Sequence, residues 1–190
     1  MIDNLLTYCS KYIQLTELDK DNIRSGFKSM KLKRKDFLLK EGQICDFVAF
    51  VNSGVIRHYH TKEGNEITCD ITLMNAFITD FKSLVEGIPS NYNFHVLKDA
   101  ELFVIRKKDL FQLYTENKNI ESLGRIMAEQ VALRTVDIAM SLASDKPEER
   151  VEKLILQRPE LFQQVPQRYL ATLLGISPES LSRIRARRKS

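Results

Sequence analysis

The sequence has 190 residues, of which 43% are hydrophobic and 28% charged, and its formal net charge is +4. This length and share of hydrophobic residues are sufficient to form the hydrophobic core of one or two domains. No apolar run approaches the ~18 residues of a membrane span, and the acidic N-terminal residues lack the basic region of a signal peptide, so we expect a cytoplasmic location.

The three cysteines, Cys9, Cys45 and Cys69, are odd in number and far apart. This spacing fits neither a disulfide framework nor a zinc site, and an iron–sulfur cluster normally uses four thiolates. We therefore expect free thiols, no cofactor and no metal.

The N-terminal half changes from helical to strand periodicity. Residues 3–27 are predicted to be helical, with a cap at Thr16. From Met30 the pattern becomes that of strands joined by glycine-containing turns. The expected strands cover residues 30–33, 37–39, 47–51, 55–60 and 67–73, with turns at 41–42, 52–54 and 62–65. This arrangement predicts an antiparallel roll or barrel.

The second half is mainly helical. A helical segment near residues 80–85 interrupts the strands, and one more strand is expected over 94–105. Helices are then expected at 107–115, 120–144 and 147–157. Ser144 or Asp145 could cap the last of these helices, and Pro159 ends it. The longest helix carries an apolar stripe that predicts either packing against the roll or a homodimer seam: Leu123, Met127, Val131, Arg134, Ile138 and Leu142.

Residues 165–190 have the pattern of two short helices joined by a tight turn. Gly175 is placed to end the first helix in the left-handed conformation, and Ser177 followed by Pro178 favours the start of the second. Leu181 and Ile184, three residues apart, would hold the second helix against the first. This spacing predicts a helix-turn-helix.

The opposite face of the second helix indicates the function. At 100° per residue, Glu179, Ser182 and Arg183 point away from Leu181 and Ile184. Residues 165–190 contain six basic residues and one acidic residue, so this segment holds all of the chain's net positive charge. Such concentration is expected where DNA phosphates are bound, although a solvated basic tail is the alternative interpretation.

Roll, long helix and helix-turn-helix occur in an order that resembles the cyclic-AMP receptor (Crp/Fnr) family of bacterial transcription regulators over essentially the whole chain. The resemblance rests on the segments 40–42, 52–55, 63–64 and, most specifically, 174–183. It implies an α+β fold with a cupin-like antiparallel β-roll and flanking helices (1–117), a dimerisation helix (118–144) and a helix-turn-helix domain (145–190).

The resemblance also implies site residues and partners. Glu179 and Arg183 would read bases together with Ser182, because a carboxylate accepts from cytosine and arginine binds guanine. Double-stranded DNA and a second copy of the chain are the expected partners. Residues 158–165 are too few for a β-hairpin wing. The expected phosphate contacts are Arg168, Ser177, Ser180, Arg185, Arg187, Arg188 and Lys189.

The effector pocket departs from the family pattern. Thr79 replaces the glycine that approaches a cyclic phosphate, Asp80 replaces the glutamate expected on the ribose, and Ser90 lies near the position of the charge-pairing arginine. We therefore expect a roll that is not controlled by cyclic AMP, although the nearby Lys82 could reach inward as a substitute cation. The degenerate pocket comprises Phe77, Thr79, Asp80, Lys82, Ser90 and Asn91.

The alternative function is a metal-dependent, cupin-like enzyme or a small-molecule-binding protein that uses the roll. His58 and His60 share one strand face, and His95 or Cys69 could join them as ligands. No glutamate accompanies them at motif spacing, and the sequence contains no nucleophile elbow, P-loop or dinucleotide fingerprint. We therefore expect no enzymatic activity. The sequence leaves open whether a small-molecule effector and RNA polymerase are further partners.

Overall fold

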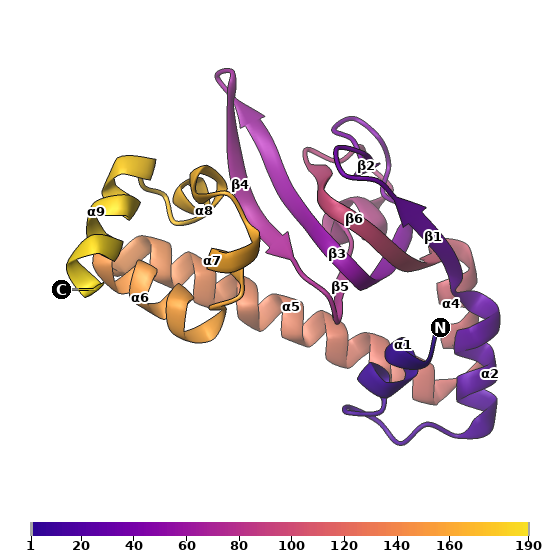
Figure 1. Cartoon of the computed structure of the whole chain (residues 1–190). Helices are drawn as coiled ribbons and strands as arrows, with labels where there is room; N and C mark the ends of the chain where they lie inside the picture. The colour runs from indigo at the N-terminus through magenta and orange to yellow at the C-terminus, as the bar shows by residue number, and fades with distance from the viewer. Residues whose placement is uncertain (1, 190) are drawn as a thin grey trace. The chain divides into compact units, whose positions relative to one another are not determined.

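The computed structural model describes residues 2–189, and these form nine helices and a six-stranded antiparallel sheet (Figure 1). The chain divides into two compact units. Unit 1 comprises Met1–His58 and Ile71–Gln130, and unit 2 comprises Tyr59–Asp70 and Val131–Ser190. No helix among the described residues is both long enough and apolar enough to cross a bilayer.

Two short helices, α1 (Asp3–Cys9) and α2 (Glu17–Gly26), begin unit 1. Thr16 caps α2 as predicted. Its side chain accepts a hydrogen bond from the backbone N–H of Asp19, and the Asp19 carboxylate accepts one from the backbone N–H of Thr16. This reciprocal capping box satisfies two donors and sets the start of α2.

The sheet has the strand order β1-β6-β3-β4, with β2 added beside β6 and β5 beside β3. Its interior is a cluster of buried apolar side chains that includes Phe47, Ile56, Phe94 and Leu102. The strands are β1 (Lys28–Leu32), β2 (Phe37–Leu39), β3 (Phe47–Lys62), β4 (Asn65–Thr72), β5 (Ala76–Ile78) and β6 (Asn93–Arg106).

The predicted turn at residues 52–54 is wrong, because β3 continues through it to Lys62. Gly54 has φ +107°, and a Cβ at this position would lie 2.6 Å from the Cβ of Ala100. The glycine therefore allows a bend and a close approach to β6 without ending the strand. The turn predicted at residues 62–65 is confirmed, with positive φ at Glu63 and Gly64.

Three helices complete the chain as far as residue 144: α3 (Phe81–Glu86), α4 (Lys107–Glu116) and α5 (Lys118–Ser144). The first half of α5 belongs to unit 1, where Leu123 is buried with Leu5, Phe50 and Phe103, and Met127 packs against the same cluster. These contacts hold the N-terminal helices and the start of α5 together.

Unit 2 contains four further helices: α6 (Pro147–Gln157), α7 (Leu161–Gln164), α8 (Gln167–Leu173) and α9 (Pro178–Lys189). Their buried side chains are Val151, Leu161, Val165, Leu170, Ala171, Leu174 and Leu181. The expected cap of α6 at Ser144 or Asp145 is wrong. Lys146 is the N-cap residue, and its backbone N–H donates to Glu149 Oε2 at 2.8 Å.

Candidate nucleic-acid interface and the segment that lines the roll

Helices α8 and α9 form the helix-turn-helix. The turn between them has the left-handed glycine and the serine cap that the sequence predicts. Gly175 has φ +65°, and the backbone N–H of Ile176 donates to Ala171 O at 3.0 Å. The side chain of Ser177 then accepts the backbone N–H of Ser180 at 3.2 Å, which caps the first turn of α9. Backbone groups at the C-terminal end of α8 and the N-terminal end of α9 therefore find hydrogen-bond partners within a turn of a few residues.

Helix α9 presents two different faces. Leu181 is fully buried and Ile184 is half-buried, whereas Glu179, Ser182 and Arg183 are exposed. The three polar side chains thus share the face predicted from the 100° helical repeat. A helix held by one apolar side with its polar side in solvent can enter the major groove of DNA.

The exposed face of α9 carries both a hydrogen-bond acceptor and hydrogen-bond donors, as the edges of DNA bases require. Hydrogen bonds from its own backbone N–H and from the Ser177 hydroxyl, with Arg183 nearby, lower the pKa of the Glu179 carboxyl. Glu179 is therefore an ionised acceptor at neutral pH, while Arg183 provides donors and contacts Ser180 Oγ at 3.2 Å. The pair offers one acceptor and one donor group on adjacent turns of α9.

The expected phosphate contacts lie in different environments. Arg187 is exposed on α9, whereas Arg185 is half-buried and its guanidinium stacks over the Phe162 ring at 5.1 Å. Arg168 stacks on the neighbouring Tyr169 ring at 4.7 Å. Ser177 and Ser180 act in the cap of α9. The side chains of Arg188 and Lys189 lie outside the described part of the structure.

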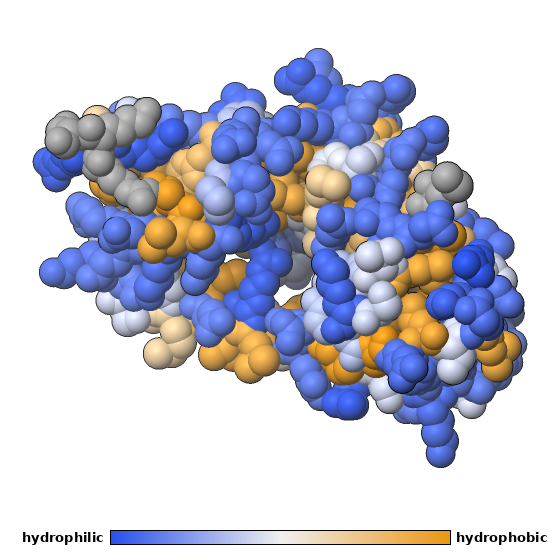
Figure 2. Space-filling model, turned by 60° about the horizontal axis from the view of Figure 1, so that its bottom comes forward, coloured by the Kyte–Doolittle hydropathy of each residue, from blue (hydrophilic) through white to orange (hydrophobic). Residues whose placement is uncertain are grey.

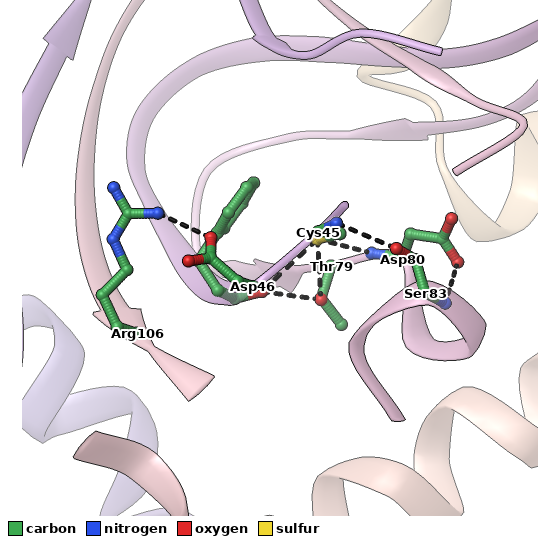
Figure 3. A network of polar contacts seen from close by, with 7 residues as sticks. Cys45, Asp46, Thr79, Asp80, Ser83 and Arg106 are labelled. Carbon is green, nitrogen blue, oxygen red and sulfur yellow. Dashed lines mark hydrogen bonds and ion pairs between the residues drawn. The ribbon is translucent and has the colours of Figure 1, made fainter. Parts of the chain in front are cut away.

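The segment expected to line the effector pocket is held by its own hydrogen bonds (Figure 3). Thr79 Oγ1 donates to Phe47 O at 2.8 Å and lies 3.4 Å from the buried Cys45 Sγ. Asp80 Oδ1 accepts the backbone N–H of Ser83, whose hydroxyl in turn donates to Ile88 O at 2.6 Å. These polar groups are therefore engaged in hydrogen bonds within the segment or to Phe47 of β3.

The remaining pocket residues lie in different environments. Ser90 is buried, and its Oγ accepts the backbone N–H of Tyr92 at 3.0 Å, while Lys82 and Asn91 are exposed. Phe77 packs against Tyr8, Phe27 and Phe50, in the cluster beneath the N-terminal helices.

The histidines considered as metal ligands are engaged with other groups. His58 Nε2 lies 2.8 Å from Thr72 Oγ1, His60 Nδ1 lies 3.1 Å from Cys69 Sγ, and the His95 ring stacks on Phe37. The described residues contain no group of three or more His, Cys, Asp or Glu side chains that could hold a metal ion.

A buried arginine was missed by the sequence analysis. Arg57 is 1% exposed and lies on β3 between Ile56 and His58. The alternation of apolar and polar residues along this strand gave no sign that the arginine is buried. A strand with both faces covered gives little alternation, so only the folded chain could show it.

Comparison with known proteins agrees with these observations. The family model of the cyclic nucleotide-binding domain matches residues 29–117. FixK2 from Bradyrhizobium japonicum is 15% identical, with a TM-score of 0.74 over 85% of this chain and 83% of that chain. The Thermus thermophilus catabolite activator protein is 21% identical, with a TM-score of 0.57 over 92% and 84%.

A third similar structure is the c-di-GMP responsive global regulator CLP of Xanthomonas campestris. It is 16% identical, with a TM-score of 0.64 over 90% of each chain. No curated protein sequence matches this chain. Residues 29–117 are therefore of the cyclic nucleotide-binding domain type by sequence, and the chain has the fold of the Crp/Fnr transcription regulators.

Proposed function

We propose that the chain is a sequence-specific DNA-binding transcription regulator and not an enzyme. The observation that carries this proposal is the division of α9 between the buried Leu181 and the exposed face of Glu179, Ser182 and Arg183. The concentration of basic residues on the same segment supports it, because phosphate contacts supply most of the affinity of such interfaces.

Selection from a random DNA library tests this proposal. Full-length protein should enrich one inverted-repeat sequence, and fluorescence anisotropy should then show tighter binding to it than to a scrambled duplex. Arg125→Ala is the matched control for changes on α9, since Arg125 is an exposed arginine that pairs with Glu129 in unit 1. Binding without any sequence preference would contradict the proposal.

The second part of the proposal is a homodimer formed through α5. The C-terminal half of this helix exposes large apolar side chains, with Leu133 at 62%, Val136 at 58% and Met140 at 61%. Their spacing of three and four residues places them on one helix face. Figure 2 brings α5 forward and shows hydrophobic residues reaching the surface among hydrophilic ones.

Leu133, Val136 and Met140 form an apolar ridge that is separate from the stripe expected from the sequence. Leu123 and Met127 are used inside unit 1, whereas Val131 and Leu142 are 49% exposed. Arg134 forms an ion pair with Asp70, and Ile138 is half-buried. We therefore propose that the partner helix packs against Leu133, Val136 and Met140, which are each more than half exposed in the single chain.

The third part of the proposal is control independent of cyclic AMP. The carboxylate of Asp80 lies at the N-terminus of α3, where it repels an incoming phosphate, and Lys82 is exposed. Among the described residues of the segment 79–92, the hydroxyls of Thr79, Ser83 and Ser90 are used in internal hydrogen bonds. A cyclic phosphate would have to displace these bonds without gaining a buried cation.

A further inference from the structure

The helix-turn-helix of unit 2 is packed against a pair of strands that lies more than a hundred residues away in the sequence. Residues Tyr59–Asp70 form the end of the β3–β4 hairpin and belong to the same compact unit as α6–α9. Figure 1 shows β4 passing beside α8. Within residues 131–189 all regular elements are helices, so the hairpin end is the β-structure of this unit.

The first contact is a pair of threonine hydroxyls. Thr172 Oγ1 on α8 donates to Thr68 Oγ1 at 2.8 Å, and the backbone N–H of Thr68 lies 3.4 Å from Thr172 Oγ1. Thr68 is only 3% exposed. Loss of this part-buried contact should be costly, because the buried Thr68 hydroxyl would be left without its partner.

The second contact is ionic. The Asp70 carboxylate pairs with Arg134 of α5 and with Arg158, which follows α6, at 3.3 Å in the latter case. Burial lowers the pKa of Arg158, while Asp70 opposes this shift. One carboxylate on β4 thus bridges α5 and the residue that follows α6.

The hairpin end is unsuited to touching DNA itself. Residues 59–70 contain three acidic side chains, Glu63, Glu66 and Asp70, and one basic side chain, Lys62. A wing that follows the phosphate backbone needs the opposite charge balance. Its contacts are instead made to Thr172 of α8 and to Arg134 and Arg158.

We propose that the end of the β3–β4 hairpin is an internal brace that orients the helix-turn-helix, with Thr68 and Asp70 as positioning residues that act through Thr172 and Arg158. This inference rests on the proposed function. Without the brace, α8 and α9 would have to be ordered when DNA binds, and that ordering reduces affinity.

The test compares Thr172→Val, which removes the hydroxyl at constant shape, with Thr172→Ser, which keeps it. Thr68→Val and Asp70→Asn extend the series. The matched control is Thr72→Val, a buried hydroxyl on the same strand that contacts His58 in unit 1. Operator affinity of the full-length proteins is measured by anisotropy at several salt concentrations, below their melting temperatures.

We expect Thr172→Val and Asp70→Asn to weaken operator binding about three- to tenfold, the range for the net loss of one hydrogen bond. The salt slope should stay unchanged because no phosphate contact is lost. Thr172→Ser and Thr72→Val should bind like wild type. Hydrogen exchange of the α8 amides should accelerate only in the variants that weaken binding.

Three outcomes would overturn the brace. Unchanged affinity with faster exchange in α8 would show that the contact is merely structural. Increased affinity would show that the hairpin restrains a resting orientation. If wild-type protein selects no operator, both the proposed function and the brace are contradicted. The other two outcomes contradict the brace alone.

Discussion

Asp80 Oδ1 accepts a hydrogen bond from the backbone N–H of Ser83 at 3.2 Å, so the first turn of α3 is capped by the chain's own carboxylate. A cyclic phosphate placed here would meet a like charge and would lose the donor that Asp80 already occupies. Together with the missing buried cation, this contact is the basis of our prediction that the roll does not respond to cyclic AMP.

Calorimetric titration with cyclic AMP and cyclic GMP checks this prediction. We expect no heat of binding at micromolar concentrations, because the loss of a buried charge partner costs about 3–5 kcal/mol. The same titration on Lys82→Ala serves as the control. Micromolar binding by wild type that disappears in Lys82→Ala would show that the lysine had replaced the missing arginine.

Recognition of bases and recognition of phosphates should separate on α9. Arg183→Ala should cost about 1–3 kcal/mol on the selected operator and blur its sequence preference, since arginine discriminates guanine by paired hydrogen bonds. Arg187→Ala should weaken all DNA sequences alike and flatten the salt dependence by about one unit. If Arg183→Ala preserves the preference, Arg183 does not read bases.

The dimer prediction concerns two faces of α5. Val136→Glu should give monomers in sedimentation velocity and poor operator affinity, because it places a charge in the apolar ridge. As Val136 is exposed in the monomer, its folding stability should change by less than about 0.5 kcal/mol. Val131→Glu is the comparison on the other face. Monomers from Val131→Glu alone would move the interface to the stripe expected from the sequence.

Local features of the helix-turn-helix were predictable from the sequence. Gly175 and Ser177 act through close neighbours and Leu181 follows the helical repeat, so their spacing alone indicated the turn, the cap and the buried face. The base-reading and phosphate-binding roles of this segment stay predictions. The overall α+β fold and its resemblance to the Crp/Fnr regulators are confirmed.

Features that depend on distant partners were not predictable. The turn expected at Gly54 is a bend because Ala100 of β6 lies against it. Leu123 belongs to the apolar stripe of α5, yet it is buried by the N-terminal helices. The contact between Thr68 and Thr172 joins residues 104 positions apart, and neither threonine stands out in its own segment.

The last prediction concerns Asp19, which is 2% exposed and links α2 to the start of α5. Its carboxylate accepts hydrogen bonds from Asn117 Nδ2 and Asn119 Nδ2, both at 2.7 Å, as well as from the backbone of Thr16. Burial raises the pKa of Asp19, but these hydrogen bonds outweigh it and hold the pKa below its ordinary value.

Because the folded-state pKa is lowered, the stabilisation by Asp19 is present above the unfolded pKa of about 3.9 and is lost as the pH falls through the folded value. Asp19→Asn should lower the free energy of unfolding by about 1–2 kcal/mol at neutral pH. Asp21→Asn is the control, since Asp21 forms only an exposed pair with Arg24 in the described structure. Urea titrations between pH 7 and pH 3 should show the deficit of Asp19→Asn shrinking at the acid end, while Asp21→Asn stays close to wild type throughout. A constant deficit in Asp19→Asn would show that shape rather than charge matters at this position.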